Sequence, residues 1–126
     1  MASRNASSAR SGFQYTPTFV ALVNLDGAPT ILGRGHVQRV GRMVQVSFRV
    51  TVDPTAAGSF SFRCTLPVPA GQLATDDIIG VGSNALSAAA GGVEADATTD
   101  QALCRGGSAD VTPEIWSYTF TYLAVS

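Results

Sequence analysis

Hydrophobic and polar residues alternate along several segments of the chain. The clearest is Met43–Val52, where Val and Phe alternate with Gln, Ser, Arg and Thr; Phe60–Leu66 and Ile115–Val125 follow the same pattern. The apolar face of the last segment consists of Trp116, Tyr118, Phe120 and Tyr122. A period of two with β-branched and aromatic residues on one side predicts strands that bury one face each.

Weaker patterns and turn residues extend this prediction over the rest of the chain. Shorter strands are predicted at Tyr15–Val23, His36–Val40, Ile78–Ser83, Val93–Ala97 and Gln101–Arg105. Gly41-Arg42 fits a two-residue type II′ hairpin loop, and Gly106-Gly107 is expected to end its strand. About eight strands at this spacing are typical of an all-β, antiparallel sandwich, jelly roll or barrel, and no segment keeps a helical period.

The 126 residues have room for one domain. We expect a flexible N-terminal arm at residues 1–14, because its first dozen residues show no periodicity, and a β domain at residues 15–126. The arm carries Arg4 and Arg10 but no acid. Its positive charge would suit docking on an acidic surface; the alternative is a disordered terminus without a partner. The arm lacks the apolar stretch of a secretory signal, and no apolar run has the length of a membrane span.

Composition points to a surface with few charges. Charged residues make up 13% of the chain, against roughly 25% in typical domains, and hydrophobic residues 45%. Either part of the surface is covered by sister subunits or a larger assembly, or Ser, Thr, Gly and Ala make it neutral. The formal net charge of -1 argues against nucleic acid and anionic membranes as partners.

No catalytic, cofactor or metal site is predicted. The one histidine, His36, cannot form a multi-histidine metal site, and the Asp76-Asp77 pair lacks calcium-loop spacing. Cys64 and Cys104 form no motif; they can pair, but two buried free thiols are the expected state. Alternation puts Glu94 and Asp96 on one face, where they either meet arginines across a subunit boundary or face solvent. We therefore expect a protein that is not an enzyme.

Several short motifs in order resemble a known viral module. They begin with Tyr15-Thr16-Pro17-Thr18 and Asn24, continue through Val40–Val46 and Val52–Gly58, and end with Leu66-Pro67 and Tyr118–Tyr122. Over Tyr15–Tyr122 the chain resembles a β-rich module of tailed bacteriophages. The module occurs as a small virion protein or at the end of larger tail proteins.

The resemblance implies a jelly-roll-like homotrimer on the outside of a virus particle, without catalytic residues. Two roles fit it: a capsid cement or decoration protein that binds the major capsid protein on the outer surface of the head, or a tail fibre, spike or receptor-binding protein that recognises a host glycan. We expect the first, because the sequence opens with Met and a short arm and shows no long shaft. The interface candidates are Arg4, Arg10, Arg49, Arg63 and Trp116. The aromatic row containing Trp116 is either core, a subunit interface or a sugar-stacking platform.

Overall fold

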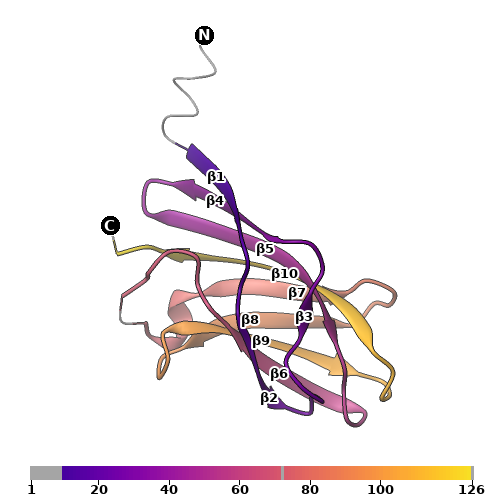
Figure 1. Ribbon diagram of the computed structural model, residues 1–126. Coiled ribbons are helices and arrows are strands. Elements are labelled where there is room, and N and C mark those ends of the chain that lie inside the picture. Colours follow the sequence, from indigo (N-terminus) through magenta and orange to yellow (C-terminus); the bar gives the residue numbers. More distant parts are fainter. Residues whose placement is uncertain (1–9, 72, 126) are drawn as a thin grey trace.

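The computed structural model describes residues 10–71 and 73–125, which form one antiparallel sheet of ten strands (Figure 1). The strands are β1 (Arg10–Tyr15), β2 (Phe19–Val23), β3 (Thr30–Ile31), β4 (Gly35–Val40), β5 (Met43–Val52), β6 (Gly58–Cys64), β7 (Ile79–Asn84), β8 (Ala90–Asp96), β9 (Gln101–Ser108) and β10 (Glu114–Leu123), with a short 3-10 helix, η1 (Thr75–Asp77). Their order is β1-β4-β5-β10-β7-β8-β9-β6-β2, and β3 also pairs with β5. The all-β, antiparallel prediction is confirmed. The strands number ten in place of about eight, and their order does not confirm the predicted jelly roll.

The sheet curls so that one of its faces encloses the core. β6 and β10 are four strand spacings apart in the sheet order, which is ~19 Å in a flat sheet. The ring centroids of Phe60 on β6 and Trp116 on β10 are nevertheless 5.2 Å apart, and those of Phe62 and Tyr118 are 5.4 Å apart. The two halves of the sheet therefore pack face to face, as the layers of a sandwich do.

A short crossing between the two edge strands closes the open side of the curl. β1 and β2 lie at opposite edges of the sheet, although just residues 16–18 separate them. Figure 1 shows this indigo segment running across the other strands. Thr18 donates its backbone N–H to Oγ1 of Thr65 at 2.9 Å and accepts the Thr65 N–H at 3.1 Å. Pro17, which predicted an edge or a bulge, is buried at the crossing.

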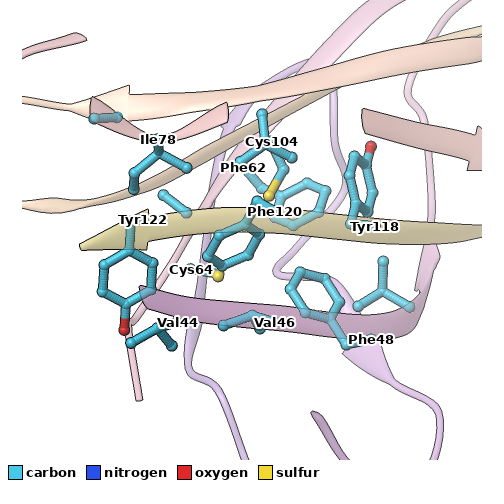
Figure 2. Close-up of a cluster of buried hydrophobic side chains, with 14 of the residues drawn as sticks. Val44, Val46, Phe48, Phe62, Cys64, Ile78, Cys104, Tyr118, Phe120 and Tyr122 are labelled. Atoms are coloured by element: carbon cyan, nitrogen blue, oxygen red, sulfur yellow. The ribbon is translucent and has the colours of Figure 1, made fainter. Parts of the chain in front are cut away.

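The core is built from the faces that the alternation predicts. Figure 2 shows part of it, where side chains of β5, β6, β9 and β10 point toward one another. The fully buried residues on these strands include Val44, Val46, Val50, Phe60, Phe62, Cys64, Cys104, Trp116, Tyr118 and Phe120. The buried phenol groups find partners, because Tyr118 donates to the carbonyl of Arg105 at 3.0 Å and Tyr122 to that of Val68 at 2.7 Å.

The N-terminal boundary differs from the prediction. Residues 10–14 of the expected arm belong to β1, which pairs with β4 from Arg10 opposite Val40 to Tyr15 opposite Gly35. The strand shows no alternation because it lies at an edge of the sheet, and its residues 12–14 are exposed. Residues 1–9 of the expected arm lie outside the described residues.

The glycine pair in β9 does not end the strand. β9 continues through Gly106 and Gly107 to Ser108, paired with the start of β6. Gly106 is required there because a Cβ would collide with the ring of Phe60 and lie 3.0 Å from the ring of Trp116. The predicted hairpin loop at Gly41-Arg42 joins β4 to β5. Gly41 has a φ of 59° and Arg42 is outside the left-handed region, as a type II′ turn requires.

Candidate functional site

The five interface candidates do not form one site. Arg49 is exposed on the outer face of β5, and Arg63 is half-buried on β6, where its guanidinium lies 3.7 Å from the carboxylate of Asp96. Arg10 begins β1, and Arg4 lies outside the described residues.

Trp116 is a core residue and presents no surface for a partner or a sugar. Its side chain is 0% exposed, enclosed by Phe60 and Tyr118. Its indole N–H donates to Oε1 of Glu114 at 3.0 Å, so even the polar edge of the ring is used within the chain. The aromatic row of β10 faces inward because the other face of this strand carries Ser and Thr, which water solvates more readily.

A groove lies where β3 and β4 share one edge of β5. β4 pairs with the first half of β5, from Val40 opposite Met43 to His36 opposite Ser47, and β3 pairs with Val50 and Thr51. Between them the chain bulges outward at residues 32–34, where the N–H of Leu32 donates to the carbonyl of Arg49 at 2.9 Å and Gly33 adopts a φ of 74°. This bulge forms one wall over the outer face of the sheet.

The groove collects positive charge and hydroxyl groups. It has a volume of about 330 Å³ and is lined by Leu32, Gly33, Arg34, His36, Ser47, Phe48, Arg49, Ser117, Tyr118 and Thr119. The rings of Phe48 and Tyr118 are buried in the core beneath, so these residues form the floor. The register of β10 on β5 places Ser117 opposite Arg49 and Thr119 opposite Ser47. We call this feature the Arg34–Arg49 groove.

Among the residues that the structure describes, no acidic side chain lines the Arg34–Arg49 groove. Nε of Arg49 lies 3.2 Å from Oγ of Ser117, which orients the guanidinium along the sheet. The ion pairs within residues 10–71 and 73–125 join Arg63 to Asp96 and Arg105 to Glu94, so neither Arg34 nor Arg49 is neutralised there. The arrangement suits a negatively charged ligand held by charge-assisted hydrogen bonds.

Sequence reasoning identified Arg49 but missed Arg34 and His36 as its neighbours. His36 begins a predicted strand, and Gly33-Arg34-Gly35 falls in the segment between that strand and the one predicted before it. An arginine between two glycines at a strand junction is the one local signal. It does not reveal which surface the bulge covers, because that depends on the pairing of β3 with β5.

A second feature of the outer face is apolar. On β7, Ile79 and Val81 are 75% and 67% exposed, and they lie opposite Thr121 and Thr119 of β10. In a sheet with one face in the core, the solvent-facing positions of a strand normally carry polar side chains, as Gln45 and Ser47 do on β5. We call Ile79, Val81, Thr119 and Thr121 the β7 strip.

The acidic residues of β8 meet arginines, and they do so within the chain. Glu94 pairs with Arg105 on the neighbouring strand, and Asp96 with Arg63 on β6. These contacts explain their placement on one face without a second subunit. Asp77 closes the turn at η1 by accepting the N–H of Ala74 at 2.8 Å. In the described part of the chain, no three His, Cys, Asp or Glu side chains lie close enough together to hold a metal ion.

The two cysteines are buried and free, as expected. Cys104 lies opposite Phe62 and Cys64 opposite Ala102, so the thiols are diagonal neighbours on β9 and β6 (Figure 2). Burial raises the pKa of the Cys104 thiol well above its usual value, and the nearby Cys64 raises it further. A thiol held in its neutral form is a poor nucleophile, so this pair behaves as part of the core.

Within residues 10–71 and 73–125, no helix has the length and hydropathy needed to cross a membrane.

Comparison with known proteins assigns this chain to no family. The sequence matches no described protein family, and no curated protein is significantly similar to it. Among solved structures, the crystal structure of the Dettilon tailspike protein is similar over 90% of this chain, with 13% identity and a TM-score of 0.48. The chain spans about a quarter of that protein, 24% of its length. At this identity and TM-score the likeness assigns no function to this chain.

Proposed function

We propose that this chain is a structural protein of a tailed-phage virion, a cement or decoration protein that binds the outside of the head. It would act as a homotrimer that stabilises contacts between major capsid proteins without chemistry. The sequence resemblance over Tyr15–Tyr122 supports the phage assignment. The observation that carries the mechanical role is the β7 strip.

The β7 strip has the character of a surface that is covered in use. Ile79 and Val81 lie on a strand with neighbours on both sides, so their exposure is not the consequence of a frayed edge. Covering these side chains removes apolar surface from water, at roughly 25 cal/mol per Å². An interface of standard size buries about 1,600 Å² in total, and repetition over many capsid positions multiplies a modest local affinity.

A charge placed in the β7 strip tests this role. In Val81→Glu the new carboxylate is solvated in the free chain, so the protein folds, but it must be desolvated when the strip is covered. We expect binding to undecorated heads of the phage, measured by co-sedimentation, to weaken at least about tenfold. Val111→Glu is the matched control, because Val111 is 58% exposed in the loop before β10.

The result also separates the two contacts that the strip can make. A smaller particle mass for Val81→Glu, measured by light scattering, assigns the strip to the contact between sister copies. An unchanged mass with lost binding assigns it to the contact with the major capsid protein. If Val81→Glu binds heads like the unmodified chain, the β7 strip is not an assembly surface and the proposed role loses its main support.

The alternative is a tail fibre, spike or receptor-binding protein that recognises a host glycan. The Arg34–Arg49 groove favours this candidate, since a concave polar site is of no obvious use to a purely mechanical clamp. Binding of the purified chain to tails in place of heads, in the same co-sedimentation experiment, would select the alternative.

A further inference from the structure

We propose that the Arg34–Arg49 groove binds an acidic sugar residue, with the carboxylate held between Arg34 and Arg49. The inference goes beyond the mechanical role and is independent of whether the chain sits on the head or the tail. It starts from the charge in the groove. Two guanidinium groups and the imidazole of His36 line one groove to which the described part of the chain contributes no carboxylate, whereas Arg63 and Arg105 each face an acid of β8.

Such an arrangement leaves two like charges on one groove. The described lining residues include no acid that would compensate them. Arg34 is carried by the bulge and Arg49 by the strand beneath it, so the two approach the groove from different walls. The hydrogen bond from Arg49 to Ser117 fixes one of these guanidinium groups before a ligand arrives. A carboxylate placed between them accepts charge-assisted hydrogen bonds from both sides.

The other lining groups select a sugar over a simple anion. Ser47, Ser117 and Thr119 present three hydroxyls on two paired strands, and each hydroxyl can both donate and accept a hydrogen bond. Leu32, 41% exposed on the bulge, adds an apolar contact. A sulfate ion accepts hydrogen bonds from the arginines and the hydroxyls, but it offers no donor to the hydroxyl oxygens and no apolar surface to Leu32. A pyranose ring with a carboxylate, several hydroxyls and an apolar C–H face uses all of them.

The size of the groove fits one or two sugar rings. Its volume of about 330 Å³ lies at the lower end of the range for small-ligand sites, ~300–1,000 Å³. A protein partner is recognised over a broader surface, ~800 Å² on each side. We therefore assign the groove to a glycan and treat an acidic peptide as the competing outcome.

The experiment compares matched ligands on the intact chain. Digalacturonate and digalactose differ in their carboxylates, acetate reports a bare anion, and a tetra-aspartate peptide reports a protein-like acid. Binding is followed by NMR titration of the backbone amides. We expect digalacturonate to shift the amides of residues 32–36, 47–49 and 117–119, with at least about tenfold higher affinity than digalactose, acetate or the peptide.

Substitutions locate the site and control for charge. Arg34→Gln and Arg49→Gln are each expected to weaken digalacturonate binding about tenfold, as loss of a hydrogen bond to a charged group predicts. Arg105→Gln removes the same charge from the exposed side of β9, which is four strands away from β5 in the sheet order and does not line the groove, and should leave binding unchanged. Amide spectra of all three confirm that they fold.

Other outcomes overturn the inference. Equal affinity for digalactose removes the role of the carboxylate, and equal affinity for acetate reduces the groove to a general anion site. Equal or tighter binding of the peptide transfers the groove to a protein partner. The absence of shifts with digalacturonate, or an effect of Arg105→Gln as large as that of Arg49→Gln, ends the assignment altogether. None of these results bears on head binding through the β7 strip.

Discussion

Asn24 shows how a single residue joins two distant motifs. It adopts a φ of 59°, and its side chain accepts the Thr55 hydroxyl at 2.6 Å and the Ala56 N–H at 2.9 Å. Its Nδ2 donates to the Ala56 carbonyl at 2.8 Å. Asn24 and the loop after β5 are separate pieces of the pattern that resembles the phage module. In the structure they are joined by these hydrogen bonds. The two motifs therefore occur together in the sequence because the fold brings them into contact.

Replacement of Asn24 separates the backbone and side-chain contributions. We expect Asn24→Ala to lower the free energy of unfolding by ~2–3 kcal/mol, because it loses these hydrogen bonds and leaves a β-carbon in the left-handed region. Asn24→Gly should lose less, ~1–2 kcal/mol, because glycine adopts this backbone conformation freely. Urea unfolding, followed by the fluorescence of the single Trp116, measures both. Equal losses would show that the left-handed conformation costs nothing here.

At the scale of the elements, the glycines of β9 decide how closely the two halves of the sheet approach. Gly106 lies against the rings of Phe60 and Trp116, whereas a Cβ on Gly107 would have the Gly58 carbonyl at 4.0 Å as its nearest neighbour. One glycine of the pair is therefore required by packing, and the other is not.

This contrast gives a matched pair of variants. Gly106→Ala should lower the free energy of unfolding by ~1–3 kcal/mol through overpacking, and Gly107→Ala should change it by less than ~0.5 kcal/mol. The same urea titration compares them. A neutral Gly106→Ala would mean that the Phe60 and Trp116 rings move apart at little cost, and the account of why β9 tolerates two glycines would be wrong.

The elements also show how far the sequence predicts the structure. Strict alternation located β5 at its exact bounds and assigned the inward faces of β6 and β10, because one face of each is core and the other is wet. Alternation is silent on β1, whose described side chains at residues 12–14 are exposed, and on the two residues of β3. The prediction that Gly106-Gly107 ends its strand was wrong, because glycine is favoured both in turns and in strands where a ring packs closely against the backbone.

The candidate site was less predictable than the fold. Arg49 stood out on the polar face of a clear strand, but Arg34 and His36 join it through the way β3 and β4 divide the edge of β5. That division is a long-range pairing, which a local pattern does not encode. The aromatic row containing Trp116 was only partly predictable. Alternation placed the row on one face of its strand but left a core, a subunit interface and a sugar-stacking platform open, and Trp116 proves to be buried in the core, with its indole N–H donated to Glu114 of the same strand.

At the scale of the whole molecule, the core keeps tyrosine phenols and a cysteine thiol in their neutral, protonated form. Burial is the main cause that raises the pKa of Tyr122 to about 12, and it raises the pKa values of Tyr15, Tyr118 and Cys104 as well. In the unfolded chain, the thiol and the phenols ionise near their ordinary values of 9.0 and 10.0. Above those values the unfolded state binds fewer protons than the folded state, so stability falls as the pH rises.

This linkage predicts alkaline sensitivity. The stability these groups provide is fully present below about pH 8.5 and is lost as the pH rises through the folded pKa values, which for Tyr122 means about 12. We expect the urea midpoint to fall steadily between pH 9 and pH 11, and Cys104→Ala to start its decline at higher pH than the unmodified chain. A midpoint that is the same at pH 7 and pH 11 would contradict the neutral, buried core.

The curled sheet has an inner face and an outer face. The inner face contains the aromatic core. The outer face carries the Arg34–Arg49 groove on β4, β5 and β10, and the β7 strip lies beside it on β10 and β7. Both features share Thr119, so a partner on the strip would sit next to the mouth of the groove. This placement is compatible with a subunit that is anchored through one part of its outer face.

The position of the chain in the intact phage particle tests the central claim most directly. Cryo-electron microscopy of the virion, with the curled sheet fitted into the map, measures it. The proposal predicts density for this chain on the outer surface of the head, as trimers with the β7 strip covered by a sister copy or by the major capsid protein. Density at the tail, or particles that lack the chain altogether, would contradict a cement protein.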